Sequence, residues 1–395
     1  MAMNTSESLL ATKYPDAIGA WVAEMAFDIA EPIREAVLRE TRNGTLGYND
    51  PVSIGLARES LAEWMQRSYH WHVLPNRVGF VSDIVSGFAA VIRHFLSDDA
   101  AVVVPTPAYT PFLTVPELVG RPVIRVPGIS GAGEHRMDFA GIDRALARGG
   151  RMVVLCHPHN PTGRAFTHEE LLTLSEVVES HQARVFSDEV HAPIGLAGRA
   201  HLPYAALGGA AANHTITATS ASKAWNVSGL KCSQLIFSSL EDSQLWDGVA
   251  GFYVRSVSRL GVAALRAAYE NQESSDWLAT TLRQLRVNNA IVAHCVTNRM
   301  PGVNYLPAES TYLAWLECAG LELTQPAEYF RQRARVAMSD GAEFGSAGHV
   351  RLNFALPKPV LEEALESLAV AVSEVHEGRR YSASSNRQTT SEVTQ

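Results

Sequence analysis

The chain has 395 residues, of which 46% are hydrophobic and 19% are charged, so it can bury the cores of a large domain and a smaller one. The formal net charge of -8 argues against a nucleic-acid-binding protein, which needs a basic surface, and favours small-molecule chemistry. The start lacks the apolar run of a signal peptide, and no stretch of the chain is apolar for long enough to span a bilayer. We therefore expect a cytoplasmic protein that does not enter a membrane.

Short apolar runs rich in β-branched residues alternate with stretches of helical periodicity through the first part of the chain. The apolar runs cover residues 77–82, 101–104, 152–155, 184–186, 215–219 and 234–237. Helices are predicted over residues 86–96 and 168–180, and the stretch 244–293 is long enough for two or more. This alternation predicts an α/β fold with a mainly parallel central sheet.

The pattern after residue 300 predicts a smaller α+β domain. Its expected elements are a strand over 312–317, a helix over 326–336, a glycine-rich turn over 341–348, a strand over 350–354 and a helix over 360–375. The predicted organisation is an N-terminal segment 1–45 associated with the small domain, a large domain 46–290, the small C-terminal domain 291–380 and a tail 381–395. We expect the tail to be disordered because it is almost entirely polar.

Chemically distinct side chains follow four of the predicted strands: Tyr109, Asn160, Asp188 and Lys223. Ligands of open α/β sheets bind outside the carboxyl ends of the strands, so these side chains are expected at one rim. A lysine forms an imine with an aldehyde when its amine is partly deprotonated, and a carboxylate keeps a pyridine nitrogen protonated. The set therefore suits a planar, anionic, electrophilic cofactor.

The stretch Ser82 to Gly87 closes a predicted strand and opens an amphipathic helix. A helix N-terminus presents free N–H groups and a partial positive charge to an anion. We expect the backbone N–H groups of Ile84 and Val85 to bind a phosphate. The four cysteines form no CxxC pair, and the spacing of the loop histidines matches no metal motif, so no metal site is expected.

Three motifs occur in order: Asn160-Pro-Thr-Gly163, Ser187-Asp-Glu189 and Ser220-Ala-Ser-Lys223. Together they resemble the fold-type I pyridoxal 5'-phosphate (PLP) enzymes of the class I/II aminotransferase superfamily, and the resemblance covers nearly the whole chain. Alone, Asn-Pro-Thr-Gly would be read as a β-turn. The resemblance implies a three-layer aminotransferase-like fold, PLP as cofactor and Lys223 as the lysine that forms the Schiff base.

The resemblance also implies further roles at the cofactor. Asp188 would pair with the pyridinium nitrogen, Asn160 and His191 would reach the ring hydroxyl, and Tyr109 would stack on the ring. The side-chain contacts to the phosphate would come from Ser220, Ser222 and Lys231, and from Tyr48 of the other subunit of a homodimer with shared active sites.

Arg351 matches the arginine that holds the substrate α-carboxylate in this superfamily, with Asn160 beside it. A guanidinium is a planar, bidentate match to a carboxylate. The substrate is therefore expected to be a small α-amino acid.

Residues 21–27, Trp-Val-Ala-Glu-Met-Ala-Phe, and residues 222–231 resemble the cystathionine β-lyase-type carbon–sulfur lyases. That branch usually has Trp-Val-Ala-Asp-Met-Asp-Phe, so Glu24 and Ala26 depart from it. Trp21 and Phe27 are expected either to line the substrate entrance or to be core or interface aromatics.

The resemblance implies β-elimination from an L-cysteine S-conjugate, either cystathionine-like or a larger biosynthetic thiol conjugate, giving a thiol, pyruvate and ammonia. Lys223 would remove the Cα proton. The alternatives are an aminotransferase of an α-amino acid and a decarboxylating oxidative deamination of a cysteine S-conjugate. A PLP-binding regulator without turnover is the non-enzyme alternative.

Overall fold

The computed structural model describes residues 13–131 and 134–391, and its centre is a seven-stranded sheet of order β2-β10-β9-β8-β7-β3-β4. The strands are β2 (Val78–Val81), β3 (Ala101–Thr106), β4 (Val123–Pro127), β7 (Gly150–Cys156), β8 (Arg184–Asp188), β9 (Thr215–Thr219) and β10 (Ser233–Phe237). Strands β4, β3, β7, β8 and β9 are parallel to one another, and β10 is antiparallel to both of its neighbours. The prediction of a mainly parallel sheet is confirmed. Strand β4 was not predicted, because at the sheet edge it alternates exposed and buried residues instead of forming a continuous apolar run.

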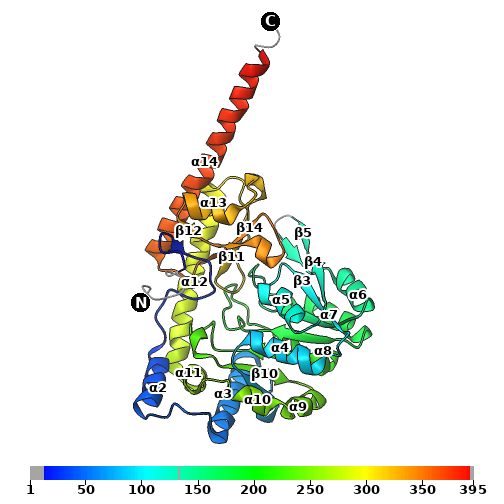
Figure 1. Cartoon of the computed structure of the whole chain (residues 1–395). Coiled ribbons are helices and arrows are strands. Elements are labelled where there is room, and N and C mark those ends of the chain that lie inside the picture. Colours follow the sequence, from blue (N-terminus) through cyan, green and yellow to red (C-terminus); the bar gives the residue numbers. More distant parts are fainter. Residues whose placement is uncertain (1–12, 132–133, 392–395) are drawn as a thin grey trace.

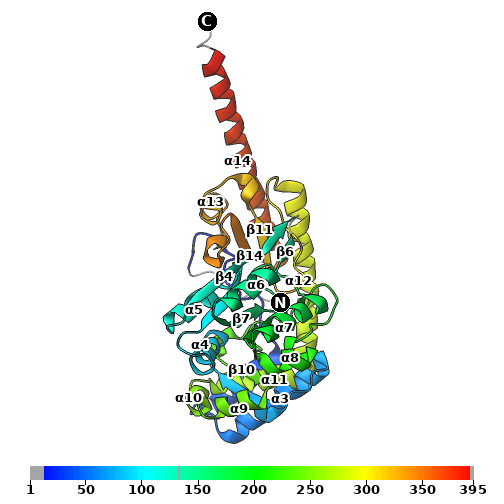
Figure 2. The ribbon, with the colours of Figure 1, turned by 90° about the vertical axis from the view of Figure 1, so that its right-hand side faces the viewer.

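Helices cover both faces of this sheet (Figures 1 and 2). One face packs against α4 (Ile84–Phe95) and α5 (Thr110–Leu118) in a core that contains Phe88 and Phe112. The other face packs against α6 (Phe139–Ala147), α7 (His168–Ser180) and α8 (Gly209–His214). The result is the expected three-layer arrangement.

Further helices connect this large domain to the rest of the molecule. They are α2 (Glu31–Arg42), α3 (Pro51–Tyr69), α9 (Leu240–Asp247), α10 (Ala250–Val254), α11 (Arg259–Glu270) and α12 (Gln272–Arg299). The stretch 244–293 thus carries several helices, as predicted. Helix α12 runs from the large domain up to the smaller one (Figure 1), where it packs against α14.

The small domain is a three-stranded antiparallel sheet with two helices. Its elements are β11 (Leu313–Glu317), β13 (Ser339–Asp340), β14 (His349–Asn353), α13 (Pro326–Arg333) and α14 (Lys358–Ser391). Helix α13 ends before the predicted residue 336 because Arg335 takes a left-handed φ of 55° and β12 (Val336–Ala337) then begins. Strand β12 pairs in parallel with β1 (Ile18–Gly19), which ties the N-terminal segment to this domain.

Helix α14 continues through Ser391 and projects away from both domains (Figure 1), whereas the sequence predicted a disordered tail from residue 381. No proline follows residue 359 and no glycine follows residue 378, so no helix-breaking residue ends it. The last part of the predicted tail, residues 392–395, lies outside the described residues. No helix among residues 13–131 and 134–391 is both long and apolar enough to cross a membrane.

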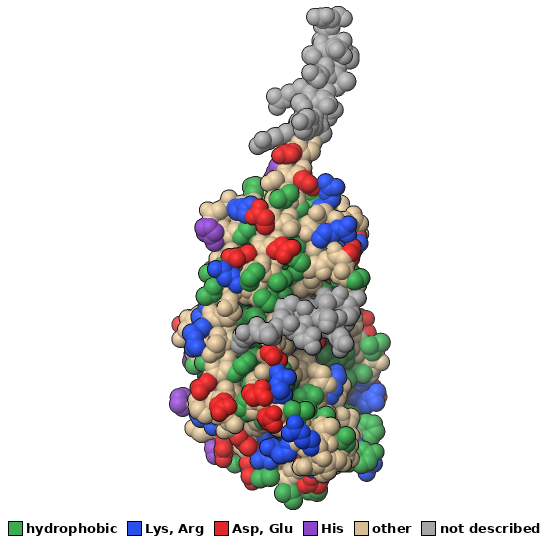
Figure 3. Space-filling view, turned by 90° about the vertical axis from the view of Figure 1, so that its left-hand side faces the viewer, with side chains coloured by type: hydrophobic (Ala, Val, Ile, Leu, Met, Phe, Trp, Pro, Cys, Tyr) green, Lys and Arg blue, Asp and Glu red, His purple; other side chains and the backbone are tan. Residues whose placement is uncertain are grey.

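On the face shown in Figure 3, basic and acidic side chains are interleaved with hydrophobic ones. The described part of that face therefore has none of the segregated positive charge that nucleic-acid binding requires.

Candidate active site

The register of the central sheet brings the polar strand ends together. Cys156 lies opposite Asp188 at the ends of β7 and β8, and Asp188 lies opposite Ala218 near the end of β9. Because β10 is antiparallel, the residues that precede it reach this same edge, and Ser233 lies opposite Val81 at the end of β2. We call this edge the strand-end rim; it carries Tyr109, Asn160, Asp188, Lys223 and Lys231.

Asp188 is buried at the centre of the strand-end rim, with 4% of its surface exposed. Its Oδ1 accepts a hydrogen bond from the N–H of Val190 at 3.1 Å, and its Oδ2 lies 3.9 Å from Cys156 Sγ. Burial raises the pKa of Asp188 to about 7, while the nearby Lys223 opposes that rise. A cation placed against this carboxyl group would ionise it, which is the relation expected with a pyridinium nitrogen.

Lys223 follows β9 and is half-buried. Its Nζ donates to the carbonyl of Ala23 at 2.9 Å, and the Tyr312 hydroxyl donates to the same carbonyl at 2.9 Å. Burial lowers the pKa of Lys223 to about 8, against a smaller opposing effect of Glu24. A substantial fraction of the amine is therefore neutral near pH 8 and can attack an aldehyde.

The start of α4 has the properties expected of a phosphate site. Asp83 caps the helix by accepting from the N–H of Ser86 at 2.8 Å, whereas the N–H groups of Ile84 and Val85 have no acceptor among the described residues. Lys231 Nζ lies 3.1 Å from Asp83 Oδ2, so a cation stands beside these free donors. Free N–H donors and a nearby cation are what the phosphate roles of Ile84, Val85 and Lys231 require, and the roles themselves stay predictions.

The two serines of the lysine loop differ in what they can offer a phosphate. The Ser220 hydroxyl donates to the carbonyl of Cys232 at 2.8 Å and accepts from the N–H of Ser222 at 3.1 Å. Its proton is therefore already used to hold the loop. The Ser222 hydroxyl has no hydrogen-bond partner among the described residues and is the better placed donor of the pair.

Arg351 links the two domains inside the site. It is buried on β14, and its Nη1 donates to Asn160 Oδ1 at 2.9 Å while its Nη2 donates to the carbonyl of Trp21 at 2.8 Å. Its Nε is buried and has no partner among the described residues. Burial lowers the pKa of Arg351 to about 10, so it stays charged at neutral pH. The unpartnered Nε–H and the second Nη1 proton are free for a carboxylate.

His191 and Tyr109 complete the predicted set. His191 is buried, its ring meets that of Tyr312 edge to face at 5.9 Å, and its Nδ1 has no partner in the described part of the chain. Burial lowers the pKa of His191 to about 3, so the ring is neutral and suited to a hydroxyl partner. Tyr109 immediately precedes α5, and burial raises the pKa of its hydroxyl.

The aromatic residues of the N-terminal segment separate into two environments. Trp21 is half-buried, its carbonyl accepts from Arg351, and its Nε1 is buried with no partner within residues 13–131 and 134–391. Phe27 is only 7% exposed and belongs to the main hydrophobic core, which accounts for this side chain without a role at the entrance.

Two asparagines that the sequence reasoning did not select hold the N-terminal segment over the strand-end rim. Asn226 Oδ1 accepts from the N–H of Met25 at 2.9 Å, and its Nδ2 donates to the carbonyl of Met25 at 2.8 Å. Asn353 Nδ2 donates to the carbonyls of Val22 at 2.8 Å and Glu24 at 2.5 Å. Asn353 comes two residues after Arg351 in the same strand. Because side chains of a strand point alternately to its two faces, the sequence could have indicated that both residues lie on one face.

Glu189 belongs to a polar network beneath the strand-end rim. It is buried and accepts hydrogen bonds from the Ser187 hydroxyl at 2.8 Å, the Tyr204 N–H at 3.0 Å and His201 Nε2 at 2.8 Å. The His201 ring lies 4.5 Å from that of His157. Within the described ranges, no group of three or more His, Cys, Asp or Glu side chains is arranged to hold a metal ion.

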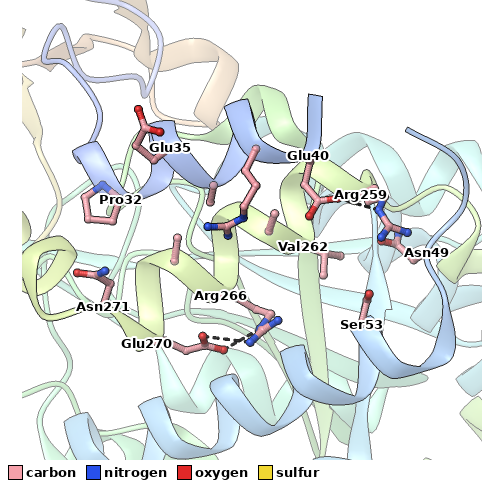
Figure 4. Close-up of a pocket in the computed structure, with 14 residues that line it drawn as sticks. Pro32, Glu35, Glu40, Asn49, Ser53, Arg259, Val262, Arg266, Glu270 and Asn271 are labelled. Carbon is pink, nitrogen blue, oxygen red and sulfur yellow. Dashed lines mark hydrogen bonds and ion pairs between the residues drawn. The ribbon is translucent and has the colours of Figure 1, made fainter. Parts of the chain in front are cut away.

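Tyr48 does not join the strand-end rim of its own chain. Its side chain is 81% exposed, while its carbonyl accepts from Arg259 Nη1 at 3.4 Å. Arg259 also pairs with Glu40 in a pocket of about 510 Å³ between α2, α3 and α11 (Figure 4). In the same pocket, Asn49 Nδ2 donates to the carbonyl of Val257 at 2.8 Å. The ring of Tyr48 is thus open to solvent, while its carbonyl and the neighbouring Asn49 side chain contact the segment around Arg259.

Comparison with known proteins agrees with this geometry. The family model described as aminotransferase class I and II matches residues 22–368. The chain is 34% identical over 361 residues to cystathionine β-lyase of Corynebacterium glutamicum, covering 91% of this chain and 95% of that one.

Solved structures agree as well. A chain of Corynebacterium diphtheriae assigned as a PLP-dependent β-cystathionase superposes with a TM-score of 0.88 at 33% identity, covering 94% of this chain and 97% of that one. The PLP-bound C-S lyase of Staphylococcus hominis superposes with a TM-score of 0.86 at 25% identity, covering 94% and 96%. The unpartnered donors of Arg351, His191 and α4, with Asp188 and Lys223, fit PLP. The chain therefore belongs to the class I and II aminotransferase family of PLP-dependent enzymes, in the branch that contains the cystathionine β-lyases.

Proposed function

We propose that the protein is a carbon–sulfur β-lyase that acts on an L-cysteine S-conjugate, either cystathionine or a larger thiol conjugate, and releases a thiol, pyruvate and ammonia. The observation that carries this proposal is a lysine amine with a pKa of about 8 in the same site as a buried arginine that has free N–H donors. The similarity to cystathionine β-lyases over nine-tenths of the chain supports it.

Each residue has a defined task in this reaction. Arg351 and Asn160 hold the α-carboxylate and thereby orient the Cα–H bond of the substrate. PLP, when bound, supplies a ring that stabilises negative charge at Cα, and Asp188 keeps the ring nitrogen protonated. The neutral amine of Lys223 takes the Cα proton, and the Cβ–S bond breaks with its electron pair leaving on sulfur. The overall reaction consumes one water molecule, because the conjugate and water together give the thiol, pyruvate and ammonia.

We also propose that the active protein is a homodimer in which Tyr48 reaches the phosphate of the partner subunit. The 81% exposure of Tyr48 supports this arrangement, because the side chain is available to a partner subunit. A mixture of Lys223→Ala and Tyr48→Ala chains tests it, because hybrid dimers would contain one site with both residues intact. Recovery of activity on mixing is expected, and two inactive proteins that stay inactive when mixed would contradict it. A cytoplasmic location remains a prediction.

The reaction is tested with L-cystathionine and larger cysteine S-conjugates, following free thiol and pyruvate with and without an added oxo acid. Thiol and pyruvate without an oxo acid are the expected result. Strict dependence on an oxo acid would replace the lyase by an aminotransferase. Release of carbon dioxide with consumption of oxygen would indicate decarboxylating oxidative deamination.

A further inference from the structure

Glu24 lies in the N-terminal segment that contacts Lys223, and its carboxylate forms no ion pair with a described Lys, Arg or His side chain. Its N–H donates to the carbonyl of Val22 at 2.9 Å and its carbonyl accepts from Asn353, so its backbone is held on both sides. The neighbouring carbonyl of Ala23 receives both Lys223 Nζ and the Tyr312 hydroxyl. Glu24 is therefore adjacent in the chain to the carbonyl that binds the central lysine.

The carboxylate of Glu24 acts on these same groups. Its negative charge raises the pKa of Lys223 and of Tyr312. The residue is half-buried, and its carboxylate has no hydrogen bond or ion pair within the described residues. Glu170, which is also half-buried, is by contrast paired with Arg164 at 2.9 Å.

When cofactor and substrate are bound, the carboxylate of Glu24 would be the charged group of the site without an opposite charge beside it among the described residues. With PLP and substrate bound, the substrate carboxylate would pair with Arg351 and the ring nitrogen with Asp188, and the amine of Lys223 would be neutral until it takes the Cα proton. The negative charge of Glu24 then has no partner beside the substrate. An unpaired, partly desolvated carboxylate attracts a cation and repels an anion.

We propose that Glu24 determines specificity by selecting amino acids whose side chain carries a positively charged group beyond Cβ, and by disfavouring those that end in a carboxylate. This inference rests on the lyase function proposed above and adds the chemistry of the leaving thiol. An aminoalkyl thiol is the simplest leaving group of this class.

The test compares three cysteine S-conjugates of similar length: S-(2-aminoethyl)-L-cysteine, S-propyl-L-cysteine and S-carboxymethyl-L-cysteine. The holoenzyme is expected to cleave the cationic conjugate with the highest kcat/KM and the anionic one with the lowest. In Glu24→Gln, the ratio of kcat/KM between the cationic and neutral conjugates should fall about tenfold. Glu363→Gln is the matched control, because Glu363 is exposed on α14 and its replacement removes the same charge far from the site.

A second measurement does not depend on turnover. L-lysine, L-norleucine and L-2-aminoadipate have matched side chains without a leaving group, and their dissociation constants are read from the absorbance of the bound cofactor. Wild-type protein should bind L-lysine more tightly than L-norleucine, and Glu24→Gln should lose about tenfold of that preference. Equal binding ratios in wild-type and Glu24→Gln protein would overturn the inference. Failure to cleave any conjugate, with the binding ratios as expected, would instead overturn the lyase reaction and leave the role of Glu24 supported.

Discussion

The strand-end rim and the N-terminal segment 20–27 that covers it are built in different ways. The rim residues follow successive strands, so ordinary sheet register brings them together. The segment is held by side chains that are far away in the sequence: Asn226 reaches Met25 across 201 residues, and Asn353 reaches Val22 across 331. We call segment 20–27 the cover. We expect the rim residues to perform the chemistry shared by the family and the cover to select among substrates.

The largest effect on activity should come from removing the amine of Lys223, which belongs to the strand-end rim. Replacing Lys223 by alanine should lower kcat for pyruvate formation by at least about 10³-fold, because the proton acceptor at Cα is lost. Lys358→Ala, on exposed α14, is the control for loss of a lysine. Measurable turnover of Lys223→Ala within tenfold of wild type would remove this residue from the mechanism.

The next largest effect should come from Arg351, which connects Asn160 of the strand-end rim with Trp21 of segment 20–27. Arg351→Lys keeps a positive charge but cannot donate to Asn160 and Trp21 while also binding a carboxylate in a planar fork. We expect kcat/KM to fall about 10²-fold. The surface variant Arg333→Lys, whose arginine pairs with Glu374, serves as the comparison, and an equal small effect in both would contradict the prediction.

The third prediction concerns the unfolding free energy of the cofactor-free protein, which should depend on pH through Asp188 of the strand-end rim. The pKa of Asp188 is raised to about 7, so its folded form favours the protonated carboxyl group. Stability from this group is present below about pH 4 and is lost as the pH rises through 7. Relative to wild type, Asp188→Asn should therefore gain roughly 2–4 kcal/mol of unfolding free energy between pH 4 and pH 8.

Urea unfolding of both cofactor-free proteins at several pH values measures this difference. Both proteins retain the same buried histidines, so the histidine titrations cancel in the comparison. A difference that does not change with pH would show that Asp188 is ionised throughout.

The smallest effect concerns the cover itself. Asn353→Ala leaves the carbonyls of Val22 and Glu24 without their donor, and we expect a loss of about 1–3 kcal/mol in unfolding free energy. Asn226→Ala should cost a similar amount, because it releases Met25 and Phe27 from the other side. Thermal unfolding measures the stability, and kcat/KM reports whether the segment still covers the rim. Unchanged values for both variants would mean that the segment is held by apolar packing alone.

The sequence by itself determined the alternation of strands and helices, the cofactor class and the order of the rim residues. Each of these depends on short-range pattern: an apolar run, a turn after it, and a polar residue such as Asp188 or Lys223 where the turn begins. The continuation of α14 and the edge strand β4 departed from this pattern, because helix propagation and edge pairing do not require an apolar run.

Only the tertiary structure decided which groups are left unpaired. Ser220 and Ser222 are two residues apart and look alike in sequence, yet the Ser220 hydroxyl donates to the carbonyl of Cys232 and the Ser222 hydroxyl has no partner among the residues that the structure describes. In the same way, the sequence around Glu24 does not reveal that this residue lies near Lys223, because the contact runs through the carbonyl of Ala23, 200 residues away in the chain. Hydrogen-bond partners of this kind depend on distance in space, and a single sequence contains no local signal for them.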